Sequence, residues 1–303
     1  MPGSSSQSSD KDAPREALPQ PRPPFPEQHL RGTGAETELE PRPRYSAPHY
    51  RAAGKLEGKV AIVTGGDSGI GRAVAVLYAR EGADVAVIYH SHDADAEETR
   101  LAVEREGQRC LLLRGDVSNK DFCAKAVTRV VDELGQVDVL VNNAGVQTRV
   151  AELVDLQQAQ LERTFAVNVF GYFFMAQACV PHMKPGSAII ATGSETGIFG
   201  SDRLLDYSAT KGAIHALTRS LSQQLLKKGI RVNAVAPGPV WTPLNPADKG
   251  LPPDKVAEFG SQSELGRPAQ PEEIAPAYVF FASTADSSFV TGQVLAELGG
   301  ATK

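Results

Sequence analysis

The sequence predicts an α/β fold over residues 55–303: a doubly wound parallel sheet of about seven strands with helices on both faces. Three observations predict it. Short apolar runs recur, longer segments with helical spacing lie between them, and this alternation repeats six or seven times. Such an alternation produces parallel strands joined by crossover helices. Residues 1–54 differ in composition, and we expect them to form a Pro-rich N-terminal arm that is disordered or extended.

The strands are expected where the apolar runs are continuous, because strands buried on both faces do not alternate with polar residues. Helices are indicated by apolar residues spaced three and four apart, as in residues 70–81 and 207–228. Two further long helices are expected at about 119–134 and 152–182. The seven runs are VAIVT (60–64), VAVI (85–88), CLLL (110–113), VDVLVNN (137–143), AIIATG (188–193), RVNAVAP (231–237) and QVLAEL (293–298).

A glycine-rich loop joins the first strand to the first helix. Residues 64–71 read Thr-Gly-Gly-Asp-Ser-Gly-Ile-Gly. Glycines let the backbone turn tightly and approach a ligand, and the helix start offers free N–H groups and a positive dipole end. The loop therefore predicts a Rossmann-type dinucleotide site with a pyrophosphate at the helix start. A P-loop is excluded, because Arg72-Ala73 stands where Lys-Ser/Thr is required.

Tyr207 and Lys211 lie four residues apart at the start of a predicted helix, which places them on one face. An ammonium group near a phenol lowers its pKa from about 10 toward neutral, so the pair is a candidate for proton transfer. Such pairs are also common on helix surfaces. Here, however, Ser194 follows the strand at 188–193, and Asn142-Asn143-Ala144-Gly145 follows the strand before it. Ligands of open α/β sheets bind at these strand ends.

Together these residues resemble a known family. TGGDSGIG, NNAG, Asn168, Ser194, Tyr207-Ser208-Ala209-Thr210-Lys211 and Pro237-Gly238-Pro239-Val240 occur in the order and spacing of short-chain dehydrogenases/reductases. The resemblance covers about residues 55–303, the length of a single-domain member. Within the family, the chain is similar to bacterial general-stress oxidoreductases and plant glucose/ribitol dehydrogenase homologues. The resemblance implies an NAD(P)-dependent enzyme that transfers a hydride between the nicotinamide and an alcohol or carbonyl substrate.

The resemblance also implies roles for single residues. Tyr207 would be the general acid/base, and Lys211 would lower its pKa and contact the nicotinamide ribose. Ser194 would orient the substrate oxygen, and Asn168 would hold a water of the proton relay. A non-catalytic NAD(P)-binding sensor on the same fold is the alternative, but it would not need Ser194, Tyr207 and Lys211 together. The implied cofactor-binding residues are Gly65, Asp67, Ser68, Gly69, Ile70, Gly71, His90, Ser91, Asp116, Val117, Asn143, Ala144, Gly145, Tyr207, Lys211, Pro237, Gly238, Val240 and Thr242.

The choice between NAD and NADP depends on the end of the second strand. An acid there would bind the adenosine ribose 2′-OH and repel a 2′-phosphate, whereas this sequence reads Tyr89-His90-Ser91-His92. The sequence therefore leans to NADP. NAD stays open, because no Arg marks this position and Asp67 in the glycine-rich loop opposes a phosphate. We expect His90 and His92 to be solvated, and no metal site is predicted.

The substrate pocket is expected to draw on residues 146–154, 195–205 and 240–264, with residues 242–262 as a flexible lid. The mixture of side chains suits a small neutral aldehyde, ketone, sugar or polyol and does not distinguish between them. For Trp241, packing beneath the lid is an equal alternative to lining the pocket. The candidate lining residues are Gln147, Phe199, Leu204, Leu205, Trp241 and Leu244.

Residues 1–54 contain 10 of the 21 prolines, no Val, Ile or Trp, and seven charges of each sign. Because so little apolar surface cannot offset the entropy of ordering, at least residues 1–40 are expected to be disordered or polyproline-like, and removable without loss of the fold. Residues 41–54 could lie along the folded surface. A clasp on a neighbouring subunit is the alternative to a solvated tail. The sizeable anchors are Phe25, Leu30, Tyr45 and Tyr50.

Composition excludes several classes of protein. A net charge of −5 and a pI near 5.7 argue against nucleic-acid binding. No apolar run approaches the roughly 18 residues of a membrane span. The first residues resemble neither a signal nor a transit peptide, and the three cysteines are scattered, so a reducing cytoplasm is expected. The predicted helix over residues 165–180 carries apolar side chains around most of its circumference, and residues 289–295 could face a partner as an edge strand. These two features predict a homo-oligomer, a tetramer in particular.

Overall fold

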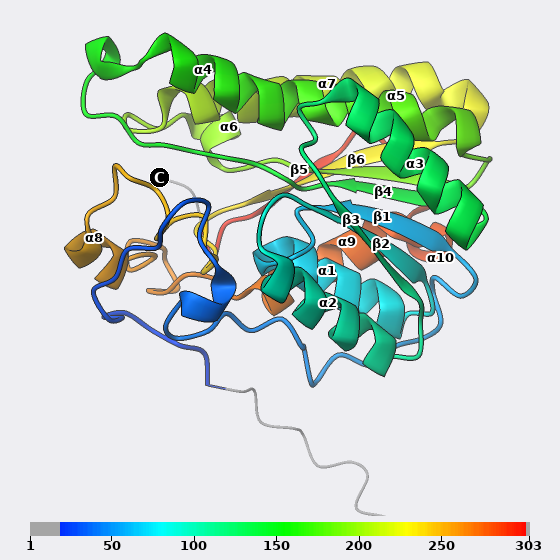
Figure 1. Cartoon of the computed structure of the whole chain (residues 1–303), viewed down its shortest axis with the longest axis horizontal. Helices are drawn as coiled ribbons and strands as arrows, with labels where there is room; N and C mark the ends of the chain where they lie inside the picture. The colour runs from blue at the N-terminus through cyan, green and yellow to red at the C-terminus, as the bar shows by residue number, and fades with distance from the viewer. Residues whose placement is uncertain (1–18, 301–303) are drawn as a thin grey trace, which may run out of the picture.

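The computed structural model describes residues 19–300, and within them seven strands form one parallel sheet (Figure 1). The strand order is β3-β2-β1-β4-β5-β6-β7, so the chain winds outward in both directions from the β1–β4 pair. A crevice for ligands opens outside the carboxyl ends of the strands at such a reversal. The predicted fold is confirmed. The strands are β1 (Val60–Thr64), β2 (Asp84–Tyr89), β3 (Cys110–Arg114), β4 (Val139–Asn142), β5 (Ala188–Thr192), β6 (Arg231–Pro237) and β7 (Val294–Glu297).

Helices cover both faces of the sheet. In Figure 1, α1, α2 and α9 lie on one face, and α3, α5 and α7 lie on the other. Short helices occupy the loops between these layers. The helices are α1 (Gly69–Arg80), α2 (Asp93–Arg105), α3 (Lys120–Leu134), α4 (Gln158–Phe165), α5 (Gly171–Cys179), α6 (Thr196–Phe199), α7 (Leu205–Leu225), α8 (Pro253–Ala257), α9 (Pro271–Ala282) and α10 (Thr284–Ser287), with short turns η1 (Glu36–Glu38), η2 (Leu153–Asp155), η4 (Val180–His182) and η5 (Leu226–Lys228).

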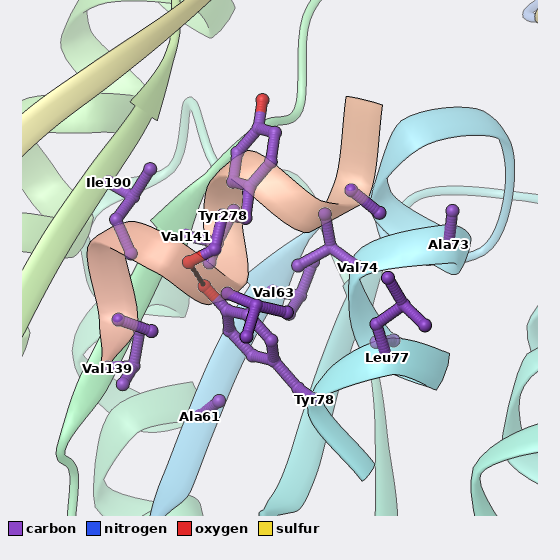
Figure 2. Packing of buried hydrophobic residues seen from close by; sticks show 14 of the residues in the cluster. Ala61, Val63, Ala73, Val74, Leu77, Tyr78, Val139, Val141, Ile190 and Tyr278 are labelled. Atoms are coloured by element: carbon purple, nitrogen blue, oxygen red, sulfur yellow. Dashed lines mark hydrogen bonds between the residues drawn. The ribbon is translucent and has the colours of Figure 1, made fainter. Parts of the chain in front are cut away.

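Two apolar clusters sandwich the sheet. One packs the side chains of α1 and α9 against β1 and β4, with Val63, Val141 and Tyr78 completely buried (Figure 2). In it, the Tyr78 hydroxyl donates a hydrogen bond of 3.0 Å to the Tyr278 carbonyl, which joins α1 to α9. The other cluster packs α3, α5 and α7 on the opposite face. Close packing on both faces makes the strand ends a rigid base for a site.

The helix expected at 152–182 runs from Gln158 to His182 without a break, through α4, a π-helical turn (Ala166–Phe170) and α5. By length and composition it is the one helix in the described chain that could cross a membrane, but half of its most apolar window is buried in the protein. Met175 is completely buried, whereas Phe170 and Phe173 are 50% and 40% exposed. The helix therefore belongs to one layer of this fold and leaves aromatic surface uncovered.

The arm is ordered over its described part, residues 19–54. Of the two alternatives expected for residues 1–40, disorder or a polyproline-like extended chain, disorder does not hold for residues 19–40. Residues 1–18 lie outside the described residues. Phe25, Leu30 and also Leu39 are at least 93% buried. The apolar surface that covers them comes from more than 200 residues away, so the local composition gave no sign of it. Apart from the short helix η1 and turns near residues 31–34 and 47–50, the described arm has no regular secondary structure.

Trp241 is the residue on which the arm packs. It is completely buried, its ring centroid lies 4.2 Å from that of Phe25, and its indole N–H donates to the Pro41 carbonyl at 2.7 Å. The packing role considered for Trp241 is therefore the correct one. The same contact ties residues 241–259 to the arm, because the Phe25 N–H also bonds the Ala257 carbonyl. The segment expected to be a flexible lid, residues 242–262, is therefore bonded to the arm at Ala257 and, just before its first residue, at Trp241.

Candidate active site

A cleft of about 300 Å³ lies along the carboxyl ends of β1 to β6. It is lined by the glycine-rich loop, by the segments that follow the strands, and by the first residues of α7. The cleft collects all but two of the residues that the sequence assigned to catalysis or cofactor binding. The exceptions are Gly71 and Asn168, which lie behind its wall. The structure therefore brings the residues chosen from strand ends together in one cleft.

The conformation of the glycine-rich loop requires residues without a Cβ atom. Gly65 and Gly69 have φ angles of +62° and +51°, which side-chain-bearing residues rarely adopt. A Cβ atom on Gly65 would lie 3.0 Å from the Ala144 backbone, and one on Gly69 would lie 2.9 Å from Thr242. On Gly71 it would lie 2.0 Å from the Gly65 carbonyl, so Gly71 lets α1 pack directly against the loop. The loop leaves space at the start of α1 that fits a pyrophosphate.

Asn143 and Thr64 hold this loop against the next strand. The Asn143 amide donates to the carbonyls of Thr64 and Gly65, at 3.0 and 3.1 Å. In return, the Thr64 hydroxyl accepts from the backbone N–H groups of Asn143 and Ala144. Asn143 therefore shapes the wall of the cleft as well as lining it.

Tyr207, Lys211 and Ser194 meet at the end of β5. All three are at least 92% buried, yet each lines the cleft. The Lys211 ammonium lies 5.3 Å from the centre of the Tyr207 ring and donates to the Thr192 carbonyl at 2.7 Å. The Ser194 hydroxyl accepts from the Thr196 N–H at 3.1 Å, which fixes its position. A phenol, an ammonium and a hydroxyl thus share one small region of the cleft.

Burial dominates the ionisation of this group. It raises the pKa of Tyr207 to about 12, and the groups that lower it against this effect are the Ser194 hydroxyl and the Arg149 guanidinium. Lys211 is not among them. Burial lowers the pKa of the Lys211 ammonium itself to about 7, so near neutral pH it carries only part of its charge. At neutral pH, Tyr207 is therefore a protonated phenol.

Asn168 lies in the π-helical turn and is completely buried. Its amide oxygen accepts from the Val146 N–H at 2.8 Å, and its amide nitrogen donates to the Val146 carbonyl and the Thr210 hydroxyl. The side chain thus joins the loop after β4 to α7. It contacts α7 at Thr210, three residues after Tyr207. Turns of this kind often mark functional positions.

The comparisons with known proteins agree with this geometry. Residues 65–302 match a family described as enoyl-(acyl carrier protein) reductase. The chain is 52% identical to general stress protein 39 of Bacillus subtilis, over 89% of this chain and 93% of the relative. It belongs to the short-chain dehydrogenase/reductase family. As such, it is an NAD(P)-dependent oxidoreductase.

Other members of the family are nearly as similar. Glucose and ribitol dehydrogenase of Daucus carota is 49% identical over 88% of this chain and 93% of its own. NADPH-dependent aldehyde reductase 1 of Arabidopsis thaliana, a chloroplastic protein, is 45% identical over 88% and 94%. A Burkholderia cenocepacia short-chain dehydrogenase solved in complex with NADP superposes with a TM-score of 0.75, at 32% identity over 81% of this chain and 98% of that one.

The adenosine end of this dehydrogenase/reductase site is polar. His90, Ser91, Asp116 and Val117 line the cleft where β2 and β3 end. Asp116 accepts from Arg163 at 2.8 Å and lies 3.8 Å from the His90 ring nitrogen. Residues 90–92, directly after β2, are His-Ser-His and include no carboxylate. Across residues 19–300, no group of three His, Cys, Asp or Glu side chains is placed to hold a metal ion.

The substrate end differs in part from the sequence expectation. Gln147, Leu204 and Leu244 line the cleft, but Phe199, Leu205 and Trp241 do not. Phe199 is 55% exposed on the outer side of α6, and Trp241 lies under the arm. Sequence reasoning did not single out several lining residues, although three of them lie inside the stretches from which it expected the substrate pocket. The missed residues are Arg149, Asn245, Phe259, Thr33 and Gly34.

Arg149 is an ion-paired member of this wall. Its guanidinium bonds the completely buried carboxylate of Asp248 at 2.6 Å, and Gln147 donates to the same carboxylate. Asn245 accepts from Gln147 at 3.0 Å. A paired arginine binds a second anion less strongly than a free one, so this end of the cleft suits a neutral substrate that hydrogen-bonds.

Proposed function

We propose that the enzyme interconverts the carbonyl and alcohol forms of a small neutral aldehyde, ketone, sugar or polyol. The observation that carries the proposal is the meeting of Tyr207, Ser194 and Lys211 beside the glycine-rich loop. The polar wall of Gln147 and Asn245 adds hydrogen-bonding groups that suit a hydroxylated substrate. Relatives named for glucose, ribitol and aldehyde support this range of substrates.

The bound nicotinamide cofactor supplies the hydride or accepts it. The chain's residues hold the partners and move the proton. The backbone at the start of α1 beyond Gly69, whose N–H bonds Glu36, and the loop around Gly65 would hold the pyrophosphate. The Ser194 hydroxyl would hydrogen-bond the substrate oxygen and aim it at Tyr207. Lys211 would contact the nicotinamide ribose.

The proton chemistry follows from the ionisation of the site. Because the pKa of Tyr207 is raised to about 12, its phenol holds a proton that can pass to the carbonyl oxygen during reduction. The phenolate left behind would be stabilised by the Ser194 hydroxyl and by Lys211 when the lysine is charged. Asn168 would hold the water that returns a proton to Tyr207. In the oxidation direction the same groups act in reverse.

For the cofactor, we propose NADP in preference to NAD. The end of β2 presents His90 and Ser91 instead of a carboxylate, so a 2′-phosphate would meet donors there and no repelling charge on that strand end. The NADP complex of the Burkholderia cenocepacia protein and the name of the Arabidopsis thaliana reductase support this choice.

We further propose that residues 55–303 are the catalytic domain of a cytoplasmic homo-oligomer, a tetramer in particular, with small molecules as its other ligands. The support is the aromatic surface at Phe170 and Phe173 and the edge position of β7, where Leu295 is 39% exposed. Light scattering tests the assembly: a monodisperse particle near the chain mass of 32.2 kDa would contradict it.

The activity is tested by incubating the protein with a panel of aldehydes, ketones, sugars and polyols, each with both cofactors in both redox states. Consumption of reduced nicotinamide with a carbonyl, or its formation with an alcohol, is the expected result. Tight cofactor binding without turnover of any compound would instead favour the alternative, a non-catalytic NAD(P) sensor on this fold.

A further inference from the structure

The N-terminal arm reaches the cofactor cleft. Thr33 and Gly34 line the cleft beside the segment that follows β2. The Thr33 hydroxyl lies 2.8 Å from the ring nitrogen of His92 and 3.2 Å from the Ser91 hydroxyl. Two hydroxyls and an imidazole are thus gathered at the strand end where the adenosine ribose of a dinucleotide binds in such folds. One of the three groups comes from outside the predicted catalytic domain.

A buried ion pair fixes this part of the arm. Glu36 is 99% buried, and its carboxylate bonds the completely buried Arg72 at 2.5 Å and the Gly69 N–H at 2.6 Å. Arg72 in turn donates to the Asp67 carbonyl at 2.6 Å. Glu36 therefore connects the arm to the middle of the glycine-rich loop and to the start of α1. A charge-assisted network of this kind allows little movement, because any displacement would leave a buried charge unpaired.

The other side of the arm's turn is fixed as well. Gly34 has a φ of +82°, and a Cβ atom there would lie 2.9 Å from Ala247 and 3.0 Å from the Pro243 carbonyl. The Leu30 N–H bonds the Pro246 carbonyl at 2.9 Å. Residues 31–34 are therefore wedged between the end of β2 and the segment that follows β6. The turn thus lines the cleft between the segment after β2, which Thr33 contacts, and the segment after β6, which Gly34 contacts.

We propose that residues 31–34 of the arm close the adenosine-ribose subsite, and that Thr33, with Ser91 and His92, discriminates between a ribose 2′-phosphate and a 2′-hydroxyl. Hydroxyl and imidazole groups donate to phosphate oxygens, and three of them in one place favour the phosphate. Asp67 is the carboxylate of the glycine-rich loop that also lines the cleft. The proposal rests on the proposed use of NAD(P).

The test compares Thr33→Glu with Thr37→Glu in the full chain. Thr37 belongs to the same arm and is also exposed, but it lies outside the cleft, so it controls for the added charge. Dissociation constants for NADPH and NADH are measured by the fluorescence of the reduced nicotinamide. Thr33→Glu should weaken the binding of NADPH at least about tenfold more than the binding of NADH, because the new carboxylate would meet the negative 2′-phosphate. Thr37→Glu should leave the ratio of the two constants within about twofold of wild type.

A second variant, Thr33→Val, removes only the hydroxyl and keeps the shape of the side chain. We expect it to reduce the preference for NADPH about threefold, with the melting temperature unchanged. If neither Thr33 variant shifts the NADPH/NADH ratio, or if Thr37→Glu shifts it equally, the proposal is overturned. A wild-type protein that binds neither cofactor would instead refute the proposed function.

Discussion

The sheet and the arm reach order by different routes. In the sheet, each strand is a continuous apolar run that is buried between two helix layers, and its hydrogen bonds go to neighbouring strands. In the described arm, three apolar anchors pack on Trp241 and Val256, and most of the chain between them is extended. The strands and helices of the sheet layers follow regular apolar patterns in the sequence, whereas the arm is stabilised by a few residues that are distant in the sequence. The first kind of order is visible in a sequence and the second is not.

The polar contacts of the arm follow the same rule. The described arm pairs with no strand, and carboxylates of the folded body accept hydrogen bonds from several of its backbone N–H groups. Glu81 accepts from the N–H groups of Ala53 and Lys55, and Glu272 accepts from that of Ala47. Asp95 does the same for Glu36 and Thr37. Acidic side chains of the folded body thus replace a neighbouring strand along the arm.

The largest effect is expected for Tyr207→Phe, which removes the proton donor at the sheet edge and keeps the ring. Turnover should fall by about 100- to 10,000-fold, with cofactor affinity retained. Tyr50→Phe in the arm is the matched control, because its hydroxyl bonds Glu81 far from the cleft. Steady-state kinetics of both variants check this, and near-wild-type turnover of Tyr207→Phe would remove Tyr207 from the mechanism.

Lys211→Met should lower both the rate and the cofactor affinity, because one ammonium serves both. It should also change the pH dependence of folding. The pKa of Lys211 is lowered from 10.5 to about 7 in the folded protein, so the unfolded chain binds more protons between these values. Wild-type stability should therefore gain from this residue as pH rises from about 7 to 10.5. Denaturant titrations across that range should show a smaller gain for Lys211→Met, and identical slopes would contradict the assignment.

The sheet and the arm should also respond differently to the loss of a buried side chain. Ile62→Ala in β1 and Phe25→Ala in the arm each remove a group that is at least 93% buried. Each substitution should destabilise the folded protein by about 3 kcal/mol, but in a different region of the chain. Amide hydrogen exchange should accelerate throughout the sheet for Ile62→Ala, and only in the arm and residues 241–259 for Phe25→Ala. Faster exchange of β1 and β4 in Phe25→Ala would show that the arm and the sheet unfold together.

The smallest effect concerns Glu36. Burial raises the pKa of its carboxyl from 4.5 to about 7, although Arg72 opposes the shift. The folded protein therefore binds this proton more tightly than the unfolded chain, and the stabilisation is present below pH 4.5 and is lost as pH rises through about 7. Relative to Glu36→Gln, the wild type should lose stability over this interval. If the difference between the two proteins is independent of pH, Glu36 does not titrate as described.

Much of the site was predictable, because its residues follow strands. The runs at 60–64 and 231–237 coincide with β1 and β6, and the residues after them line the cleft as expected. The misses have one cause. Trp241 was assigned to the pocket or the lid because nothing in residues 1–54 indicated that Phe25 would cover it. Arg72 served only to exclude a P-loop, since its partner Glu36 lies in a segment whose composition suggested disorder.

The role of Asn168 shows the limit of motif reasoning. The motif placed this residue at the site, and the structure places its side chain behind the wall, bonded at both ends to Val146. Residue identity is local information, whereas the direction in which a side chain points depends on the surrounding packing.

In the proposed reaction the nicotinamide passes a hydride directly to the carbonyl carbon of the substrate, and Tyr207 supplies the proton. The most direct measurement uses NADPH that carries deuterium at the transferable position, together with the best carbonyl substrate found in the panel. Mass spectrometry of the alcohol formed should place the deuterium on the carbinol carbon, and Tyr207→Phe should form almost none of this product. Alcohol formed without deuterium, or formed equally by Tyr207→Phe, would contradict the account.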